Sequence, residues 1–226
     1  ALRELYYNFV DANHIIVGNP HLKAEHSSSF NGSLSCTLPK TKQGHQNVIT
    51  LSSFYNTFNN LINYATSTTS TDTTITVNID KYKNTGIMIE DKLQSKNFTA
   101  SLGFSYIGRY NQLADAEGFK NENLPHFMWS PEINARMIYE LSKNGARLAL
   151  FYKFSGKKPG YEAVTNTSTG AQEIHLTHID GCHIADFTIN KKLFTYFSVS
   201  GGVKNIFNVT QLTNTSTNPD GVHSTG

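Results

Sequence analysis

The chain has 226 residues and a formal net charge of +2, with 38% hydrophobic and only 16% charged residues. This length suits one large domain or two small ones. Both fractions are low for a water-soluble globular domain. The small net charge argues against a nucleic-acid-binding protein, which would carry a basic face or stripe. No apolar run reaches the ~18–20 residues of a transmembrane helix.

Most of the chain alternates apolar with small polar residues, as amphipathic strands do. The pattern is clearest between Phe98 and Tyr110, with Phe98, Ala100, Leu102, Phe104, Tyr106 and Tyr110 on one face and Thr99, Ser101, Gly103, Ser105 and Arg109 on the other. We predict eight strands, over residues 30–38, 48–60, 75–93, 98–110, 133–141, 148–154, 185–189 and 193–207. Gly86 is expected to relieve a bend or bulge inside the third strand.

The predicted connections alternate between short and long, with long polar loops near residues 63–73, 112–127, 156–181 and from 208. Long strands with short turns at one end and long loops at the other are typical of outer-membrane barrels. Aromatic residues near strand ends fit membrane-interface girdles, or else ordinary cross-strand pairs. They are Tyr55, Phe58, Tyr106, Tyr110, Phe127, Trp129, Tyr152 and Phe154. The alternative is a β-sandwich adhesin or binding module, whose apolar face would pack on a second sheet.

Five charged residues fall on the polar faces of predicted strands: Arg109, Arg136, Glu140, Arg147 and Lys153. In a barrel they would point into the lumen, where they would line the permeation path or hold a plug. The simpler interpretation is a hydrated lumen wall, which a wide barrel needs in any case.

Cysteines and clustered histidines offer two further hypotheses. Cys36 and Cys182 are the only cysteines, and we favour one disulfide over two unpaired thiols. Near Cys182 stand His175, His178 and His183, so a zinc or copper site is conceivable. Residues three apart face opposite sides of a strand, however, and we favour polar loop residues.

Several segments resemble TonB-dependent receptors of the outer membrane, particularly those of Bacteroidetes type. They are LRELYY at 2–7, GNPHLKAE at 18–25, residues 54–62, residues 78–90, and SVSGGVKNIFN at 198–208, a specific late-barrel motif. The resemblance implies an all-β chain that forms an antiparallel transmembrane β-barrel. It would supply about eight strands of a 22-stranded barrel with a plugged lumen, the plug and closing strand being absent. Residues 1–226 would be the C-terminal part of this barrel, with 1–23 an extracellular loop, 24–207 barrel strands and 208–226 the final extracellular loop.

The same resemblance implies a function in the bacterial outer membrane. It implies active transport energised by the TonB–ExbB–ExbD complex acting through the plug, no enzymatic activity and no intrinsic cofactor. The favoured cargo is an iron source, above all haem. The alternatives are a siderophore, cobalamin, or a glycan or peptide delivered with a surface lipoprotein. The expected surroundings are outer-membrane lipid, and no nucleic acid is expected as a partner.

In haem receptors of this family, a haem-ligating histidine lies between a Phe/Tyr-Arg-Ala-Pro box and an Asn-Pro-Asn/Asp-Leu box. His14 lies in that interval, before Asn19-Pro20-His21-Leu22, although Leu5-Tyr6-Tyr7 departs from the first box. A neutral imidazole is a good axial ligand for haem iron. The candidate ligand-binding residues are Tyr6, Tyr7, His14, Asn19 and His21, with His14 as the iron ligand. The alternative is that His14 is solvated or packs within the loop.

Overall fold

The fold is known from a computed structural model, which describes residues 2–10, 15–66, 73–119, 122–141, 145–165, 172–194 and 196–216. Within these ranges, no helix is both long enough and apolar enough to span a membrane.

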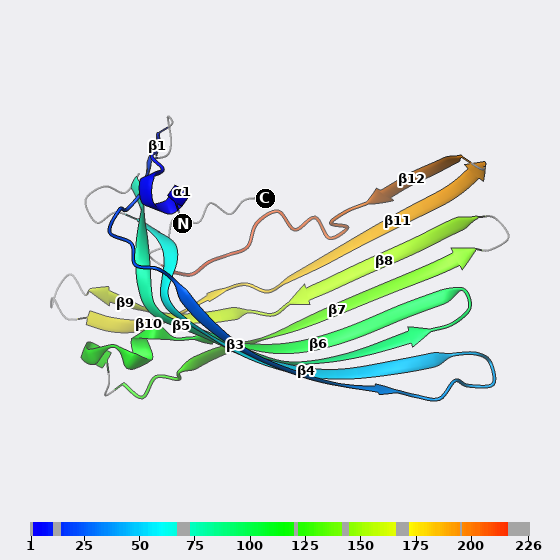
Figure 1. Cartoon of the computed structure of the whole chain (residues 1–226), viewed down its shortest axis with the longest axis horizontal. Helices are drawn as coiled ribbons and strands as arrows, with labels where there is room; N and C mark the ends of the chain where they lie inside the picture. Colours follow the sequence, from blue (N-terminus) through cyan, green and yellow to red (C-terminus); the bar gives the residue numbers. More distant parts are fainter. Residues whose placement is uncertain are drawn as a thin grey trace.

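Eight long strands of the described chain form one curved antiparallel sheet (Figure 1). They are β3 (His26–Thr37), β4 (Gln46–Thr66), β5 (Thr73–Gln94), β6 (Phe98–Tyr110), β7 (Phe127–Leu141), β8 (Ala146–Ser155), β11 (Cys182–Phe194) and β12 (Phe197–Val203). Each strand pairs antiparallel with the next in this order. Eight antiparallel strands and the all-β fold are therefore confirmed, but the bounds predicted for the last strand, 193–207, are wrong. Residues 193 and 194 still belong to β11, and β12 ends at Val203. In this chain the sheet is open.

The connections sort to the two ends of the sheet, as Figure 1 shows. At the end called here the turn end, the chain passes from β3 to β4, β5 to β6, β7 to β8 and β11 to β12. At the opposite end, the loop end, it passes from β4 to β5, β6 to β7 and β8 to β11. The last two connections are long, as predicted, whereas residues 67–72 between β4 and β5 are fewer than residues 38–45 between β3 and β4 at the turn end.

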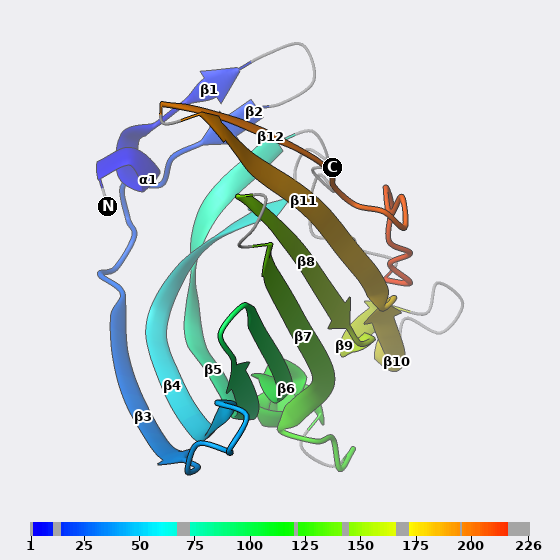
Figure 2. The ribbon, with the colours of Figure 1, turned by 90° about the vertical axis from the view of Figure 1, so that its right-hand side faces the viewer.

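Because successive side chains of a strand point to opposite sides, the sheet has two chemically different faces. One face, the outer face, carries a row of paired apolar residues: Leu34, Leu51, Ile89, Phe104, Ile133 and Phe154. The inner face carries the neighbouring row: Ser52, Met88, Ser105, Glu132 and Ser155. Leu51 is 51% exposed, whereas Ser105 is 8% exposed, as expected for the convex and concave sides of a curved sheet (Figure 2).

The β-sandwich alternative is wrong for the described chain. The ten strands β1 to β8, β11 and β12 belong to a single sheet, and the other sheet of the described residues is the small pair β9–β10 at the loop end. No second sheet therefore packs on the outer face. Leucine, isoleucine and phenylalanine remain exposed along it. An apolar face of this extent is unfavourable in water and suits contact with lipid.

Short elements at the loop end were not predicted. They are α1 (Leu2–Tyr6), β1 (Phe9–Val10), β2 (Ile15–Val17), η1 (Gln112–Asp115), η2 (Glu117–Phe119), β9 (Lys158–Thr165) and β10 (Gln172–Ile179). The predicted long loop between β8 and β11 is in part wrong, because β9 and β10 form an antiparallel hairpin there. Its glycine- and threonine-rich sequence hides the alternation that marks a strand.

Of the bend or bulge predicted at Gly86, the bulge is wrong. Pairing of β5 with β4 and with β6 runs through Gly86 without a register shift. A Cβ at this position would lie 2.7 Å from Cε1 of Phe54. Glycine is needed here because the Phe54 ring takes the space of a side chain.

The predicted disulfide is wrong as well. Cys36 and Cys182 are both free thiols. Cys36 lies in β3 and Cys182 in β11, and five strands separate them in the sheet. With neighbouring strands about 4.8 Å apart, the two residues lie well beyond the ~7 Å Cα separation that a disulfide can bridge.

The close pairing of β12 with β11 leads to a prediction about two adjacent glycines. A Cβ at Gly202 would clash with the backbone oxygen of Phe187, whereas a Cβ at Gly201 would meet no atom within 4 Å. Gly202→Ala should therefore destabilise the barrel by about 1–3 kcal/mol, because the backbone of β11 must move. Gly201→Ala, the matched control, should change stability by less than about 0.5 kcal/mol. The measurement is the midpoint of thermal unfolding of the detergent-solubilised receptor, followed by heat-modifiable gel mobility. Equal midpoints for the two variants would contradict the packing described here.

Candidate functional site

The two N-terminal motifs lie against each other at the loop end. Helix α1 packs on the Asn-Pro turn, and the backbone N–H of Asn19 donates to the carbonyl of Glu4 at 3.0 Å. A Cβ at Gly18 would lie 2.9 Å from the backbone oxygen of Leu5. Glycine at position 18 is thus what allows the helix and the turn to touch. Residues 2–10 and 15–23 are called the N-terminal unit below.

Side-chain amides attach the N-terminal unit to the start of β5. The amide of Asn19 donates to the carbonyl of Thr76 at 3.0 Å, and its oxygen accepts from the N–H of His21 at 2.9 Å. The side-chain oxygen of Asn78 accepts from the backbone N–H of Lys23 at 2.7 Å, and the side-chain amide of Asn78 donates to the carbonyl of Lys23 at 3.1 Å. In addition, β2 pairs in parallel with the first residues of β5. Asn19, a candidate ligand residue, therefore has a structural role in this turn.

The other N-terminal candidates are placed on the same unit. Tyr6 is 68% exposed, and Tyr7 stacks on Phe9 with ring centres 6.2 Å apart. His21 is exposed beside the turn. His14 lies outside the described residues, in the segment that joins β1 to β2. The structure thus brings together the sequence motifs on either side of His14.

A network of charges lies on the inner face near the loop end. Arg109 and Lys153 approach the two carboxylate oxygens of Glu132 at 3.9 and 3.7 Å, and Arg109 donates to the hydroxyl of Ser130 at 2.6 Å. The Glu132 side chain is only 15% exposed. Sequence reasoning missed Glu132, although its strand position has the same parity as Arg136. It balances two of the predicted lumen cations.

The remaining predicted lumen residues lie on the same face, nearer the turn end. Glu140 and Arg147 are cross-strand partners with their charged atoms 4.0 Å apart. Both side chains are more than half exposed, so this pair contributes little stability. Arg136 lines a cavity of about 410 Å³ together with Glu90 and Lys92. The register therefore places all five predicted lumen residues on the inner face.

A larger cavity lies at the loop end of the inner face, between the sheet, η1 and β9. Its volume is about 680 Å³. It is called the mouth cavity here and is lined by Leu61, Ile62, Asn63, Tyr82, Arg109, Tyr110, Asn111, Gln112, Leu113, Met128, Pro159, Gly160, Tyr161, Glu162 and Ala163. This size is that of small-molecule sites. Tyrosine rings and a guanidinium group can contact a flat ligand that carries negative charge.

Asn111 fixes the wall of the mouth cavity that η1 provides. Its side-chain oxygen accepts from the N–H of Leu113 at 3.2 Å and so caps η1. Its amide nitrogen donates to the carbonyl of Pro125 at 3.0 Å, and its backbone N–H donates to the carbonyl of His126 at 2.9 Å. The loop between β6 and β7 is thus held close to the rim of the sheet.

The metal-site alternative near Cys182 gains no support. In the ranges that the structure describes, no group of three or more metal-binding side chains comes together. His178 approaches Asp180 at 3.3 Å, whereas His183 hydrogen-bonds the Tyr152 hydroxyl at 2.8 Å. The histidines therefore have separate partners.

The geometry agrees with comparisons to known proteins. Residues 1–206 match the family described as TonB dependent receptor-like, beta-barrel, and the chain belongs to this family. Proteins of this family reside in the bacterial outer membrane, and so does this chain. No characterised protein matches it in the sequence comparison.

Two solved structures show the same fold. The FrpB iron transporter from Neisseria meningitidis (F3-3 variant) is 15% identical with a TM-score of 0.53, over 89% of this chain and 30% of that chain. A mutant of the ferric enterobactin receptor PfeA from Pseudomonas aeruginosa is 18% identical with a TM-score of 0.51, over 86% of this chain and 27% of that chain. The chain thus spans less than a third of the length of each of these receptors.

The attachment of the N-terminal unit can be tested at Asn19. Asn19→Ala removes the contacts with Thr76 and with the N–H of His21. Each such hydrogen bond contributes about 1 kcal/mol, so the loss of both should make local opening about thirtyfold more frequent. Amide hydrogen exchange of residues 15–23 in the detergent-solubilised receptor should accelerate accordingly. His21→Ala is the control, because it removes an exposed ring and leaves the backbone N–H in place. Equal exchange in the two variants would argue against an anchoring role for Asn19.

Proposed function

We propose that this chain forms the late part of the barrel of a receptor that imports an iron complex by TonB-dependent transport, with haem as the favoured cargo. Membership of the family supports active transport across the outer membrane. Both solved neighbours handle iron compounds, one as an iron transporter and one as a ferric enterobactin receptor. The narrower placement among Bacteroidetes-type receptors stays a prediction from the sequence segments.

The observation that carries the haem proposal is the pairing of the residues that flank the segment containing His14. Val10 and Ile15 are partners in the β1–β2 pairing, so these two flanking residues lie next to each other. The N-terminal unit that contains these two residues is tied to β5 at the loop end. The described residues on either side of the segment that contains His14 therefore lie at the loop end, which supports a ligand-binding role for this part of the chain.

The chemistry of the surroundings fits haem. A neutral imidazole at His14 would supply an axial nitrogen to the iron. The exposed ring of Tyr6 lies on the same unit and can contact a flat macrocycle. The mouth cavity, on the inner face of the sheet, is lined in part by Tyr82, Tyr161 and Arg109. The Arg109 guanidinium suits the carboxylates that haem carries.

The mouth cavity also favours a second cargo of the same class, a ferric siderophore. Aromatic rings and a cation would recognise an anionic, ring-bearing chelate as well as they would recognise haem. Cobalamin, glycan and peptide cargoes, the last two with a surface lipoprotein, rest on the family resemblance alone. In each case the TonB–ExbB–ExbD complex would supply energy through the plug.

The haem proposal predicts the behaviour of His14→Ala. Addition of haem to the purified receptor should give a Soret band typical of histidine-ligated iron. His14→Ala should lose this spectrum and weaken binding by at least about tenfold, since an iron–nitrogen bond is removed. His21→Ala, a histidine on the same unit, should keep both.

The axial-ligand assignment of His14 and the choice of cargo can be tested separately. An unchanged spectrum in His14→Ala would remove the axial-ligand assignment. Energised cells that take up a ferric siderophore but no haem would replace haem by the second cargo, and cells that take up neither would contradict iron import.

A further inference from the structure

Aromatic side chains form a continuous series on the outer face that leads to the loop end. Tyr106 and Trp129 stack with ring centres 5.0 Å apart and an interplanar angle of 14°. Trp129 lies 6.2 Å from Phe127, which lies 6.3 Å from Tyr110. The pairing of β6 with β7 gives all four the register positions of the outer face, which also carries Phe104. Tyr106 and Trp129 are exposed there, at 41% and 37%, whereas Tyr110, at the end of β6, is only 9% exposed and also lines the mouth cavity. Such rings gather where a bilayer meets water.

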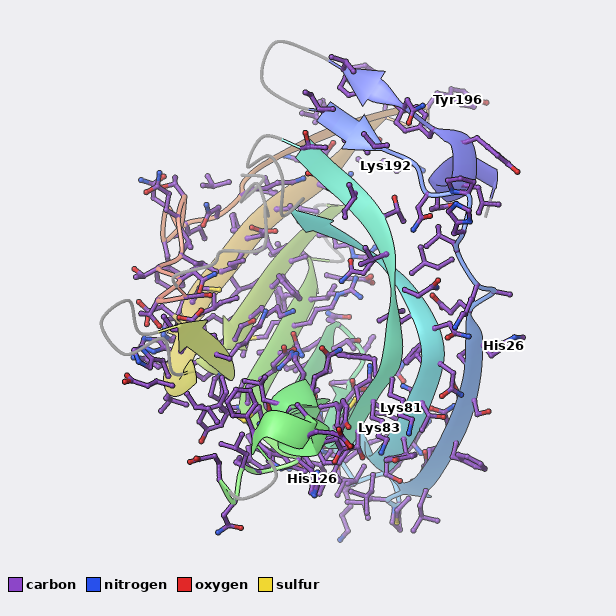
Figure 3. The ribbon with its side chains drawn as sticks, turned by 90° about the vertical axis from the view of Figure 1, so that its left-hand side faces the viewer. His26, Lys81, Lys83, His126, Lys192 and Tyr196 are labelled. Atoms are coloured by element: carbon purple, nitrogen blue, oxygen red, sulfur yellow. The ribbon has the colours of Figure 1, made fainter. Side chains whose placement is uncertain are left out.

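Cationic groups stand just beyond these rings. The ammonium group of Lys83 lies 5.0 Å from the centre of the Tyr110 ring. Lys81 follows on the same face of β5, about 7 Å nearer the loop end. Figure 3, which views the loop end, shows Lys81 and Lys83 side by side and His126 in the same region. Lys81, Lys83 and His126 are called the cationic cluster.

A carboxylate, that of Asp115, lies next to the cationic cluster. Asp115 accepts a hydrogen bond from the Tyr110 hydroxyl and approaches Nδ1 of His126 at 3.4 Å. The Tyr110 hydrogen bond, and after it the charges of His126, Lys83 and Lys81, hold the pKa of Asp115 below its ordinary value. Asp115 therefore stays ionised at neutral pH. It carries one negative charge against the two ammonium charges of Lys81 and Lys83.

The position of this charge points to a lipid partner. Below the aromatic series, Ile87 and Ile89 are 51% and 48% exposed on the same face of β5. In the outer membrane this surface meets acyl chains, and lysines beyond the aromatic rings extend towards the headgroups. The inner-face cations Arg109 and Lys153 differ, because Glu132 pairs with both.

We propose that the cationic cluster binds the phosphate of an anionic lipid headgroup in the outer leaflet, while the aromatic and aliphatic residues below it contact the acyl chains. Lys81 and Lys83 together offer six N–H donors to phosphate oxygens. His126 adds a further donor at the rim of the loop. The inference needs the membrane location of the chain and is independent of the cargo.

The test compares phosphorylated and phosphate-free lipid. The complete receptor is purified in neutral detergent and titrated with bis-phosphorylated lipid A and with its dephosphorylated form, with bound lipid counted by native mass spectrometry. We expect the phosphorylated lipid to bind at least about tenfold more tightly than the phosphate-free lipid. The double variant Lys81→Gln/Lys83→Gln should lose this preference while keeping its heat-modifiable gel mobility.

Lys191→Gln is the matched control. Lys191 is exposed on the outer face but lies near the turn end of β11, where it pairs with Val199. Its substitution should leave binding of phosphorylated lipid A unchanged. Equal binding of the two lipids, or wild-type binding by the double lysine variant, would overturn the proposal. So would inorganic phosphate that binds as tightly as the lipid, because the site would then take free phosphate.

Discussion

Both proposed sites depend on the backbone ladder between β4 and β5. This pair runs from Gln46 opposite Gln94 at the turn end to Thr66 opposite Thr74 at the loop end. On the other edge of β5, β6 pairs with its turn-end half, and β2 pairs with its first residues. One long strand thus holds the neighbouring barrel wall and the N-terminal unit. If β5 slipped by one residue, every side chain along it would move to the wrong face.

Because successive side chains of a strand point to opposite sides, the two faces of the sheet meet different surroundings. On β5, Ile87 and Ile89 point outward, whereas Met88 and Glu90 point inward. The outer face needs apolar groups because lipid cannot hydrogen-bond a polar side chain. The inner face is lined by polar residues, and its charges are paired where they are buried. Glu132 is the clearest example, since it is largely covered and meets two cations.

The loop end of the sheet carries polar and charged groups that differ from those of the two faces. At the loop end, the sheet carries the mouth cavity inside, the N-terminal unit at its rim and the cationic cluster outside. Asn111, at the mouth cavity, and Asn19, in the N-terminal unit, have similar structural roles. The side-chain amide of each hydrogen-bonds backbone groups and so holds an irregular segment in place. Asparagine suits this task, since one short side chain both donates and accepts hydrogen bonds. The richness in asparagine noted in the sequence thus has a structural use in the loops.

The sequence by itself determined the features that depend on neighbouring residues. Alternation of side chains is local, so the eight strands, their two faces and the inner position of residues such as Arg109 could be read from it. The late-barrel segment at 198–208 and the other quoted segments were enough to predict the family. Tertiary structure decided the features that depend on distant residues. Glu132 became a shared counter-ion only when β6, β7 and β8 aligned, and Gly86 was explained only by the ring of Phe54 on the neighbouring strand. The β9–β10 hairpin, the mouth cavity and the cationic cluster likewise join residues far apart in the chain, and no local pattern encodes such contacts.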